Sequence, residues 1–223
     1  MIIVHHLNNS RSQRVLWLLE ELGIEYEIRH YQRDKITMLA PPELRAVHPL
    51  GKSPVITDGD VTVAETGAVI EYLLDTYGAG RLRPEQGSKE ARQFTYWLHY
   101  AEGSIMPLMV MTLIFRRLET APMPFFVKPV ARAIVAKVKG GYLDPNTKTH
   151  LDFMESEITK TGWFAGDQFS AADIQMSFPV EAAQARGALN ERKNLANFVE
   201  RIHARPAFQR ALARGGPYEL MRG

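Results

Sequence analysis

Glu65 and Thr66 stand where a predicted strand passes directly into a predicted helix. The first N–H groups of a helix have no partner inside it, and together with the positive end of the helix dipole they favour a carboxylate. The Thr66 hydroxyl adds one hydrogen bond, and the Glu65 carboxylate suits an ammonium group. One α-amino acid head group would therefore satisfy both residues. The alternative interpretation is that the two residues only cap the helix.

A second signal precedes this pair in residues 48–55, which read HPLGKSPV. A proline between a turn and a strand lacks a hydrogen-bond donor, so it is confined to a sheet edge or a special turn. If the Ser53–Pro54 bond is cis, the backbone N–H and C=O of Ser53 face outward and pair with an extended peptide as an added strand. The alternative is an ordinary edge-strand proline. The two signals together favour a site for a peptide with a free amino-acid end.

The sequence gives little support to other kinds of chemistry. The chain has no cysteine, so any sulfur in its reaction comes from a ligand. His5, His6 and His99 have no companions at the spacing of a metal site, so we interpret them as structural and predict no metal. The net charge of +2 is small and dispersed, which argues against a nucleic-acid partner.

The elements that would position these residues form an α/β unit at the front of the chain. Strand-like runs at 2–7 and 26–31 flank a helical pattern at 14–22, which predicts two parallel strands joined by a helix. Asp58-Gly59-Asp60 predicts a hairpin between two further short strands, and a helix at 65–77 closes the unit. A weak stretch at 41–47 is either a loop or one additional helix.

The pattern becomes almost entirely helical after residues 78–84, which read as a linker because they contain two glycines and a proline. A long helical region at 89–118 contains Pro107, which predicts a bend there. Four shorter helical patterns follow, at 131–138, 150–159, 171–185 and 195–204. The sequence therefore predicts two domains, an α/β domain at 1–80 and an all-helical domain at 88–223.

Three separated segments resemble the glutathione S-transferase superfamily, in the right order. Two are HPLGKSPV and the helix start AETGAVIEYL, and the third is GWFAGDQFSAADI at 162–174. In the third, Ser170 and Asp173 form a capping box that we assign to folding rather than catalysis. The segment HHLNNSRSQRVLWLLEELG is similar to the fungal and bacterial Gtt-like, serine-type branch. The resemblance covers essentially the whole chain. It implies a thioredoxin-like domain followed by a helical bundle, glutathione as co-substrate, and a homodimer.

The resemblance also implies a catalytic hydroxyl. In the serine classes of this superfamily, a hydroxyl just after the first strand donates a hydrogen bond to the glutathione thiolate, and Ser10 stands at that place. The positive end of the following helix would lower the thiol pKa further. Ser12 and Asn9 in the same turn are rival candidates, and Ser10 also begins an S-x-x-Q capping box.

The same resemblance places Lys52, Ser53 and Pro54 at the glutathione site, together with Glu65 and Thr66. Lys52 would reach a carboxylate of the ligand. The chain departs from the family pattern at residues 40–43, which lack the basic residue that several serine-class members carry.

The second substrate is expected between the two domains. Tyr96, Tyr100 and Met106, with Met109 and Phe115, form an aromatic and methionine-rich face suited to apolar molecules, although plain core is the alternative. Residues 125–139 combine basic and apolar side chains. They predict a surface helix that acts as a lid or flanks a dimer interface, rather than a membrane anchor.

These patterns predict a cytoplasmic enzyme that conjugates the glutathione thiolate to a small hydrophobic electrophile, as in detoxification. The amino-terminal residues do not read as a signal peptide, and the longest apolar stretch is too short to span a bilayer, so no integral membrane segment is expected. The alternatives are a glutathione-dependent peroxidase and a non-catalytic glutathione-binding regulatory protein.

Overall fold

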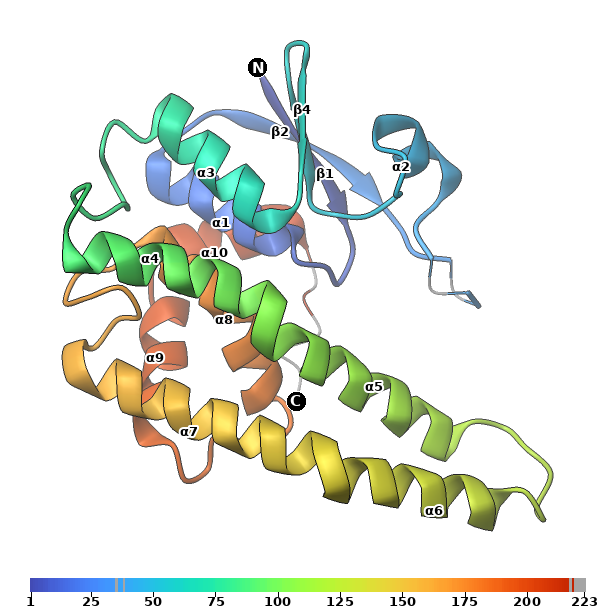
Figure 1. Cartoon of the computed structure of the whole chain (residues 1–223). Coiled ribbons are helices and arrows are strands. Elements are labelled where there is room, and N and C mark those ends of the chain that lie inside the picture. Colours follow the sequence, from blue (N-terminus) through green and yellow to red (C-terminus); the bar gives the residue numbers. More distant parts are fainter. Residues whose placement is uncertain (35, 38, 217, 219–223) are drawn as a thin grey trace.

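The computed structural model describes residues 1–34, 36, 37, 39–216 and 218. The front of the chain forms a four-stranded sheet with the order β2-β1-β3-β4 (Figure 1). Its strands are β1 (Ile2–Leu7), β2 (Tyr26–Tyr31), β3 (Val55–Asp58) and β4 (Val61–Ala64). β1 runs parallel to β2, whereas β3 pairs antiparallel with both β1 and β4. The predicted parallel pair and the predicted hairpin are therefore confirmed.

Three helices complete this unit, namely α1 (Ser12–Leu22), α2 (Pro42–Val47) and α3 (Thr66–Tyr77). The additional helix at 41–47 is thus present. Because side chains alternate along a strand, Val4 of β1 joins the main core beneath α1 and α3, whereas Leu7 packs with Leu44 of α2. Gly23 ends α1 in the left-handed conformation, as the sequence suggests.

The remaining chain is helical. Its elements are α4 (Lys89–Tyr100), a π-helical segment η1 (Ala101–Ile105), α5 (Met106–Thr120), α6 (Lys128–Val138), a second π-helical segment η2 (Lys139–Leu143), α7 (Asp144–Thr161), α8 (Ala171–Gln184), α9 (Lys193–His203) and α10 (Pro206–Gly215). The α5–α6 hairpin projects away from the rest of the molecule (Figure 1). Residues 78–88 contain neither helix nor strand, while the division into 1–80 and 88–223 stays a prediction.

Two features differ from the sequence expectation. The irregularity expected at Pro107 takes the form of η1, which ends two residues before the proline. Proline has no N–H to donate to the carbonyl four residues earlier, and the wider turns of a π-helix accommodate the missing bond. The second difference is α10, which the sequence analysis missed although Pro206 suits the first turn of a helix.

α10 packs closely on α1 of the sheet unit. The rings of Trp17 and Phe208 meet edge to face, with centroids 5.1 Å apart. A Cβ added at Gly215 would lie 2.5 Å from Gln13 Oε1, so a larger residue there would displace this side chain of α1. α10 thereby fixes the position of α1, the helix that follows β1.

The continuous helical stretch Lys89–Thr120 is long and apolar enough to cross a membrane, by length and composition alone. Core helices of soluble proteins pass the same test. Trp97 and Leu98 of its first part belong to the main hydrophobic core, so this stretch carries no membrane assignment.

The predicted capping box is confirmed at the start of α8. The Asp173 carboxylate is fully buried and accepts the backbone N–H groups of Phe164 and Ser170, both at 2.8 Å. Burial raises the pKa of Asp173 to about 6, against the effect of these hydrogen bonds. This carboxylate lies inside the helical core, as a folding role requires.

Candidate active site

The turn before β3 has the geometry that the sequence analysis considered for a peptide site. The Ser53–Pro54 bond is cis, and Gly51 just before it has a positive φ of 56° that favours glycine. The Ser53 hydroxyl donates to the backbone carbonyl of His5 at 2.9 Å, which fastens the turn to β1. Pro54 is buried, whereas Ser53 stays half-buried at a cavity wall.

The start of α3 leaves its polar groups available to a ligand. Glu65 is exposed and has a φ of 74°, a conformation that costs a non-glycine residue about 1–3 kcal/mol. Its side chain makes no capping hydrogen bond to the helix. The buried Thr66 hydroxyl accepts a hydrogen bond from Arg14 Nη2 at 3.2 Å, which leaves its own proton free to donate.

Arg14 is a functional neighbour that sequence reasoning missed, because it reads as an ordinary residue of α1. Its fully buried guanidinium donates to Glu102 Oε1 and to the Gln175 carbonyl, both at 2.5 Å. Burial lowers the pKa of Arg14, and the ion pair with Glu102 opposes that shift. Arg14 therefore ties Thr66 to η1 and α8 and fixes the position of its hydroxyl.

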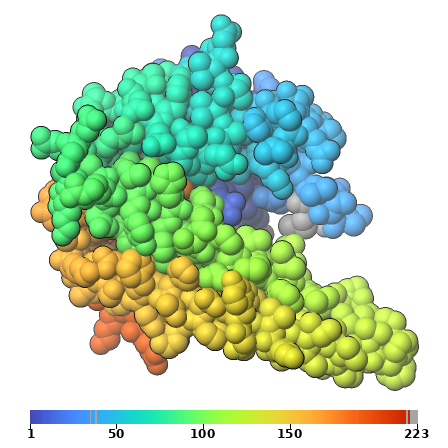
Figure 2. Space-filling view, in the orientation of Figure 1, coloured from blue at the N-terminus to red at the C-terminus, as the bar shows by residue number. Residues whose placement is uncertain are grey.

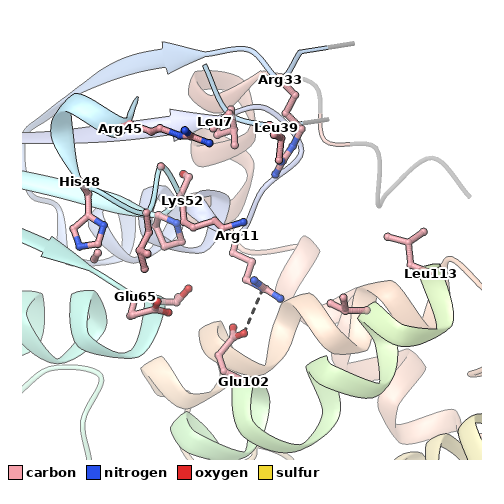
Figure 3. Close-up of a pocket in the computed structure, with 18 of the residues that line it drawn as sticks. Leu7, Arg11, Arg33, Leu39, Arg45, His48, Lys52, Glu65, Glu102 and Leu113 are labelled. Carbon is pink, nitrogen blue, oxygen red and sulfur yellow. Dashed lines mark ion pairs between the residues drawn. The ribbon is translucent and has the colours of Figure 1, made fainter. Parts of the chain in front are cut away.

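A cavity of about 840 Å³ brings together all five residues predicted to contact glutathione, namely Lys52, Ser53, Pro54, Glu65 and Thr66. Figure 3 shows Lys52 and Glu65 in this cavity. Figure 2 shows the hollow between the sheet unit and α5. Five cationic side chains line this cavity against the two carboxylates of Glu65 and Glu102, so its potential is positive; the cations are Arg11, Arg33, Arg45, Lys52 and Arg117.

Of these cations, the sequence analysis named only Lys52. Arg45 lies on α2 and folds over Gly51, where an added Cβ would come within 2.6 Å of Arg45 Cγ. This arginine stands close to residues 40–43, the segment that lacks the basic residue expected by resemblance. The sequence analysis did not predict the contact between Arg45 and Gly51, because no pattern in the sequence indicates it.

Ser10 lines a second cavity of about 350 Å³, and Ser53 lines both cavities, so the two adjoin at Ser53. Ser10 Oγ lies 2.7 Å from Ser12 Oγ and 3.4 Å from Ser53 Oγ. The Ser10 oxygen also accepts the Ser12 N–H at 3.3 Å, a turn contact of the kind that a helix cap makes. Ser10 is thus held at the junction between the two cavities.

The two rivals of Ser10 differ in position. Asn9 lines the second cavity, with a positive φ of 50°. Ser12 is completely buried, lines neither cavity, and lies with its Oγ 2.9 Å from His6 Nδ1. Burial, with a smaller contribution from His30, lowers the pKa of His6 to about 4. The Ser12 hydroxyl is therefore hydrogen-bonded to a neutral His6 in the interior of the protein.

The residues expected to bind the electrophile separate into two groups. Met106 and Met109 line the second cavity. Tyr96 and Tyr100 stack on each other with centroids 5.6 Å apart, and neither they nor Phe115 line either cavity. Tyr100 instead hydrogen-bonds to His150 of α7, because this face of α4 turns toward α7. Among the residues that the structure describes, no group of three His, Cys, Asp or Glu side chains is arranged to hold a metal.

Residues 1–75 match the family model of the glutathione S-transferase N-terminal domain, and residues 137–206 match that of the C-terminal domain. Glutathione S-transferase 3 of Schizosaccharomyces pombe is 38% identical over 209 residues, which cover 93% of this chain and 85% of that protein. The chain belongs to the glutathione S-transferase family. As an enzyme of this family, it uses glutathione as its co-substrate.

Other relatives agree with a fungal-like glutathione S-transferase. Glutathione S-transferase 1 of Saccharomyces cerevisiae is 37% identical over 193 residues, covering 83% of this chain and 82% of that protein. A solved glutathione S-transferase from Actinobacillus pleuropneumoniae superposes with a TM-score of 0.74 at 30% identity, over 100% of this chain and 97% of that one. A sphingomonad glutathione S-transferase, solved in complex with glutathione, shares the fold with a TM-score of 0.72 at 22% identity, over 96% and 98%.

Proposed function

We propose that this transferase holds glutathione along the first cavity and conjugates its thiolate to a small hydrophobic electrophile in the second. The supporting observation is the convergence of Lys52, Ser53, Pro54, Glu65 and Thr66 on one cavity that adjoins Ser10. The γ-glutamyl carboxylate would meet the α3 amino terminus and the Thr66 hydroxyl, and Glu65 would take the amine. The cysteinyl backbone would pair with that of Ser53, and Lys52 would take the glycine carboxylate.

This placement directs the glutathione sulfur toward Ser10, whose hydroxyl donates a hydrogen bond to the thiolate. The α1 amino terminus adds positive potential at the same point. The thiol loses its proton to solvent, and the thiolate then attacks the electrophile. A carbon–sulfur bond forms, and the leaving group departs with its electron pair. The chain itself contributes orientation and stabilisation of the thiolate.

Two measurements test this function directly. Calorimetry should detect binding of glutathione, and binding should weaken for an analogue that lacks the γ-glutamyl amine, because Glu65 then loses its partner. Conjugation of glutathione to 1-chloro-2,4-dinitrobenzene should exceed the rate without enzyme. A folded protein that takes up no glutathione would contradict the proposal.

We also propose that the enzyme is a homodimer that serves detoxification in the cytoplasm, where glutathione keeps thiols reduced. Exposed apolar side chains on the α5–α6 hairpin support an association surface, because single chains seldom leave such side chains grouped in water; they include Leu113, Ile114, Phe125, Phe126, Val130 and Ile134. Sedimentation equilibrium should report twice the chain mass. A sedimenting monomer at all concentrations would contradict the dimer, and cosedimentation with vesicles would instead assign the hairpin to a membrane surface.

A further inference from the structure

Three arginines surround the second cavity, and they come from separate parts of the chain. Arg11 precedes α1, Arg33 follows β2, and Arg186 follows α8. The cavity wall between them is mainly apolar, with Met106, Met109, Val110, Leu113, Phe178 and Ala182. Of the described residues that line this cavity, none is an aspartate or glutamate. An apolar cavity with an excess of positive charge suits an apolar molecule with a negative charge.

Arg186 is the least compensated of these arginines. Its side chain is half-buried, and it makes neither a hydrogen bond nor an ion pair with any residue that the structure describes. Burial lowers the pKa of Arg186, and the like charge of Arg116 lowers it further. A partly desolvated cation without an acidic neighbour is unfavourable unless an anion joins it.

The other two arginines strengthen the positive potential. Burial, together with Arg11 and Arg117, lowers the pKa of Arg33. Arg11 pairs with Glu102 at 3.4 Å, and its guanidinium lies 5.6 Å from the ring centre of Phe178. Glu102 is also the partner of Arg14 at 2.5 Å, so one carboxylate is shared between two cations. Among the described residues that line this cavity, no carboxylate faces the three arginines.

We propose that the second substrate of this transferase is an apolar anion, an aromatic or aliphatic electrophile with a carboxylate or a similar group that Arg186 binds. The proposal rests on the proposed function and names the substrate class of the same site. The apolar wall receives the body of the molecule, and the planar guanidinium of Arg186 matches a carboxylate with two parallel hydrogen bonds. In the proposed function, the two carboxylates of glutathione bind in the first cavity, at the α3 start and at Lys52, so Arg186 is not needed for them.

Two electrophiles of the same shape but different charge test this inference, namely 4-chloro-3-nitrobenzoate and its neutral amide, 4-chloro-3-nitrobenzamide. In both reactions a carbon–sulfur bond forms, chloride leaves with its electron pair, and the thiol proton goes to solvent. Each kcat/KM is divided by the rate constant with free glutathione, which removes the intrinsic reactivity. The corrected ratio of benzoate to amide should exceed one in the wild-type enzyme.

Arg186→Ala should lower this ratio about tenfold, because it removes a charge-assisted contact that only the benzoate makes. Arg132→Ala is the matched control, since Arg132 is exposed on α6 and lines neither cavity. It removes the same charge and should keep the ratio. A wild-type ratio of one or below would overturn the proposal, as would an unchanged ratio in Arg186→Ala. A rise in the KM for glutathione as the main effect would assign Arg186 to glutathione instead.

A binding experiment separates failure of the inference from failure of the proposed function. Calorimetry without glutathione compares the unreactive 3-nitrobenzoate with 3-nitrobenzamide, in the wild type and in Arg186→Ala. Tighter binding of the benzoate that is lost in the variant supports the anion site even if the protein conjugates neither electrophile, in which case the proposed function alone fails. Equal affinities in the wild type would refute the anion site even if conjugation proceeds.

Discussion

Replacing Ser10 with alanine tests the catalytic assignment. A hydrogen bond to a charged group contributes about 1.5–3 kcal/mol, and this sets the gross value of a Ser10 contact with the thiolate. In the free protein the Ser10 hydroxyl has a partner in Ser12 Oγ at 2.7 Å. Breaking that neutral bond costs about 0.5–1.5 kcal/mol, so the net stabilisation of the thiolate is about 1.5 kcal/mol.

This net value corresponds to about one pKa unit. The pKa of bound glutathione should therefore rise by about one unit in Ser10→Ala. The ultraviolet absorbance of the thiolate, recorded against pH in the binary complex, measures this directly. Below the wild-type thiol pKa, kcat should fall about tenfold, whereas the plateau at high pH should be retained because the thiol is then ionised in both proteins.

Ser12→Ala is the matched control for this experiment, because it deletes the same hydroxyl two residues away. Ser12 is buried against His6 and lines neither cavity, so its loss removes no contact with the thiolate and should not raise the thiol pKa. Because Ser10 then no longer has to break its bond to Ser12 Oγ, the thiol pKa should fall, by up to about one unit. The substitution should also lower the free energy of unfolding by about 1–3 kcal/mol, since His6 Nδ1 loses its partner. The reasoning is refuted if Ser10→Ala leaves the thiol pKa where it was, or if Ser12→Ala raises it by the same amount.

Three further changes have defined outcomes. Glu65→Gln should weaken glutathione binding about tenfold by calorimetry, because the amine loses its charged partner, whereas Thr66→Ser should bind like the wild type; equal losses in both would contradict the assigned contacts. The pKa of His6 falls from 6.5 to about 4 on folding, so the unfolded chain takes up the proton first as the pH drops. The stabilisation from neutral His6 is complete above pH 6.5, and urea titrations should show it decrease by up to about 3 kcal/mol toward pH 4. An NMR titration in which His6 ionises near its ordinary pKa would disprove this. Asp173→Ala leaves two buried N–H groups without an acceptor, so it should lower the free energy of unfolding in urea by about 2–6 kcal/mol. The affinity for glutathione should be unchanged where the protein stays folded. A decrease below about 1 kcal/mol would show that the capping box is dispensable.

Much of the fold follows from short windows of sequence. The run at 2–7, the helical spacing at 14–22 and the Asp-Gly turn at 58–60 each specify a local element, and the structure contains all three. The cis bond before Pro54 and the helix start at Glu65 are likewise local, because turn chemistry depends on adjacent residues. Turns and helix starts that present backbone groups at the ends of elements are therefore visible in a single sequence.

The helical region was harder to predict, since its patterns do not state which face meets which neighbour. Tyr96 and Tyr100 read as part of a ligand face, but they contact Phe153 and His150 of α7. Tyr100 is buried there, and Tyr96 is exposed on the surface away from both cavities. The sequence analysis missed α10 because Pro206 reads as the end of a helical pattern. In the structure, Pro206 begins the helix, and the packing of Phe208 against Trp17 stabilises it.

By itself, the sequence determined the order of the elements from β1 to α3, the proline turn and the helix start at Thr66, since each depends on neighbours within a few residues. Only the tertiary structure decided that Ser10 lines a cavity while Ser12 turns inward to His6. It also brought Arg11 and Arg33 to the same cavity as Arg186. Burial and charge compensation are sums over all surrounding segments, so the chemistry of such side chains emerges only when distant parts of the chain pack together.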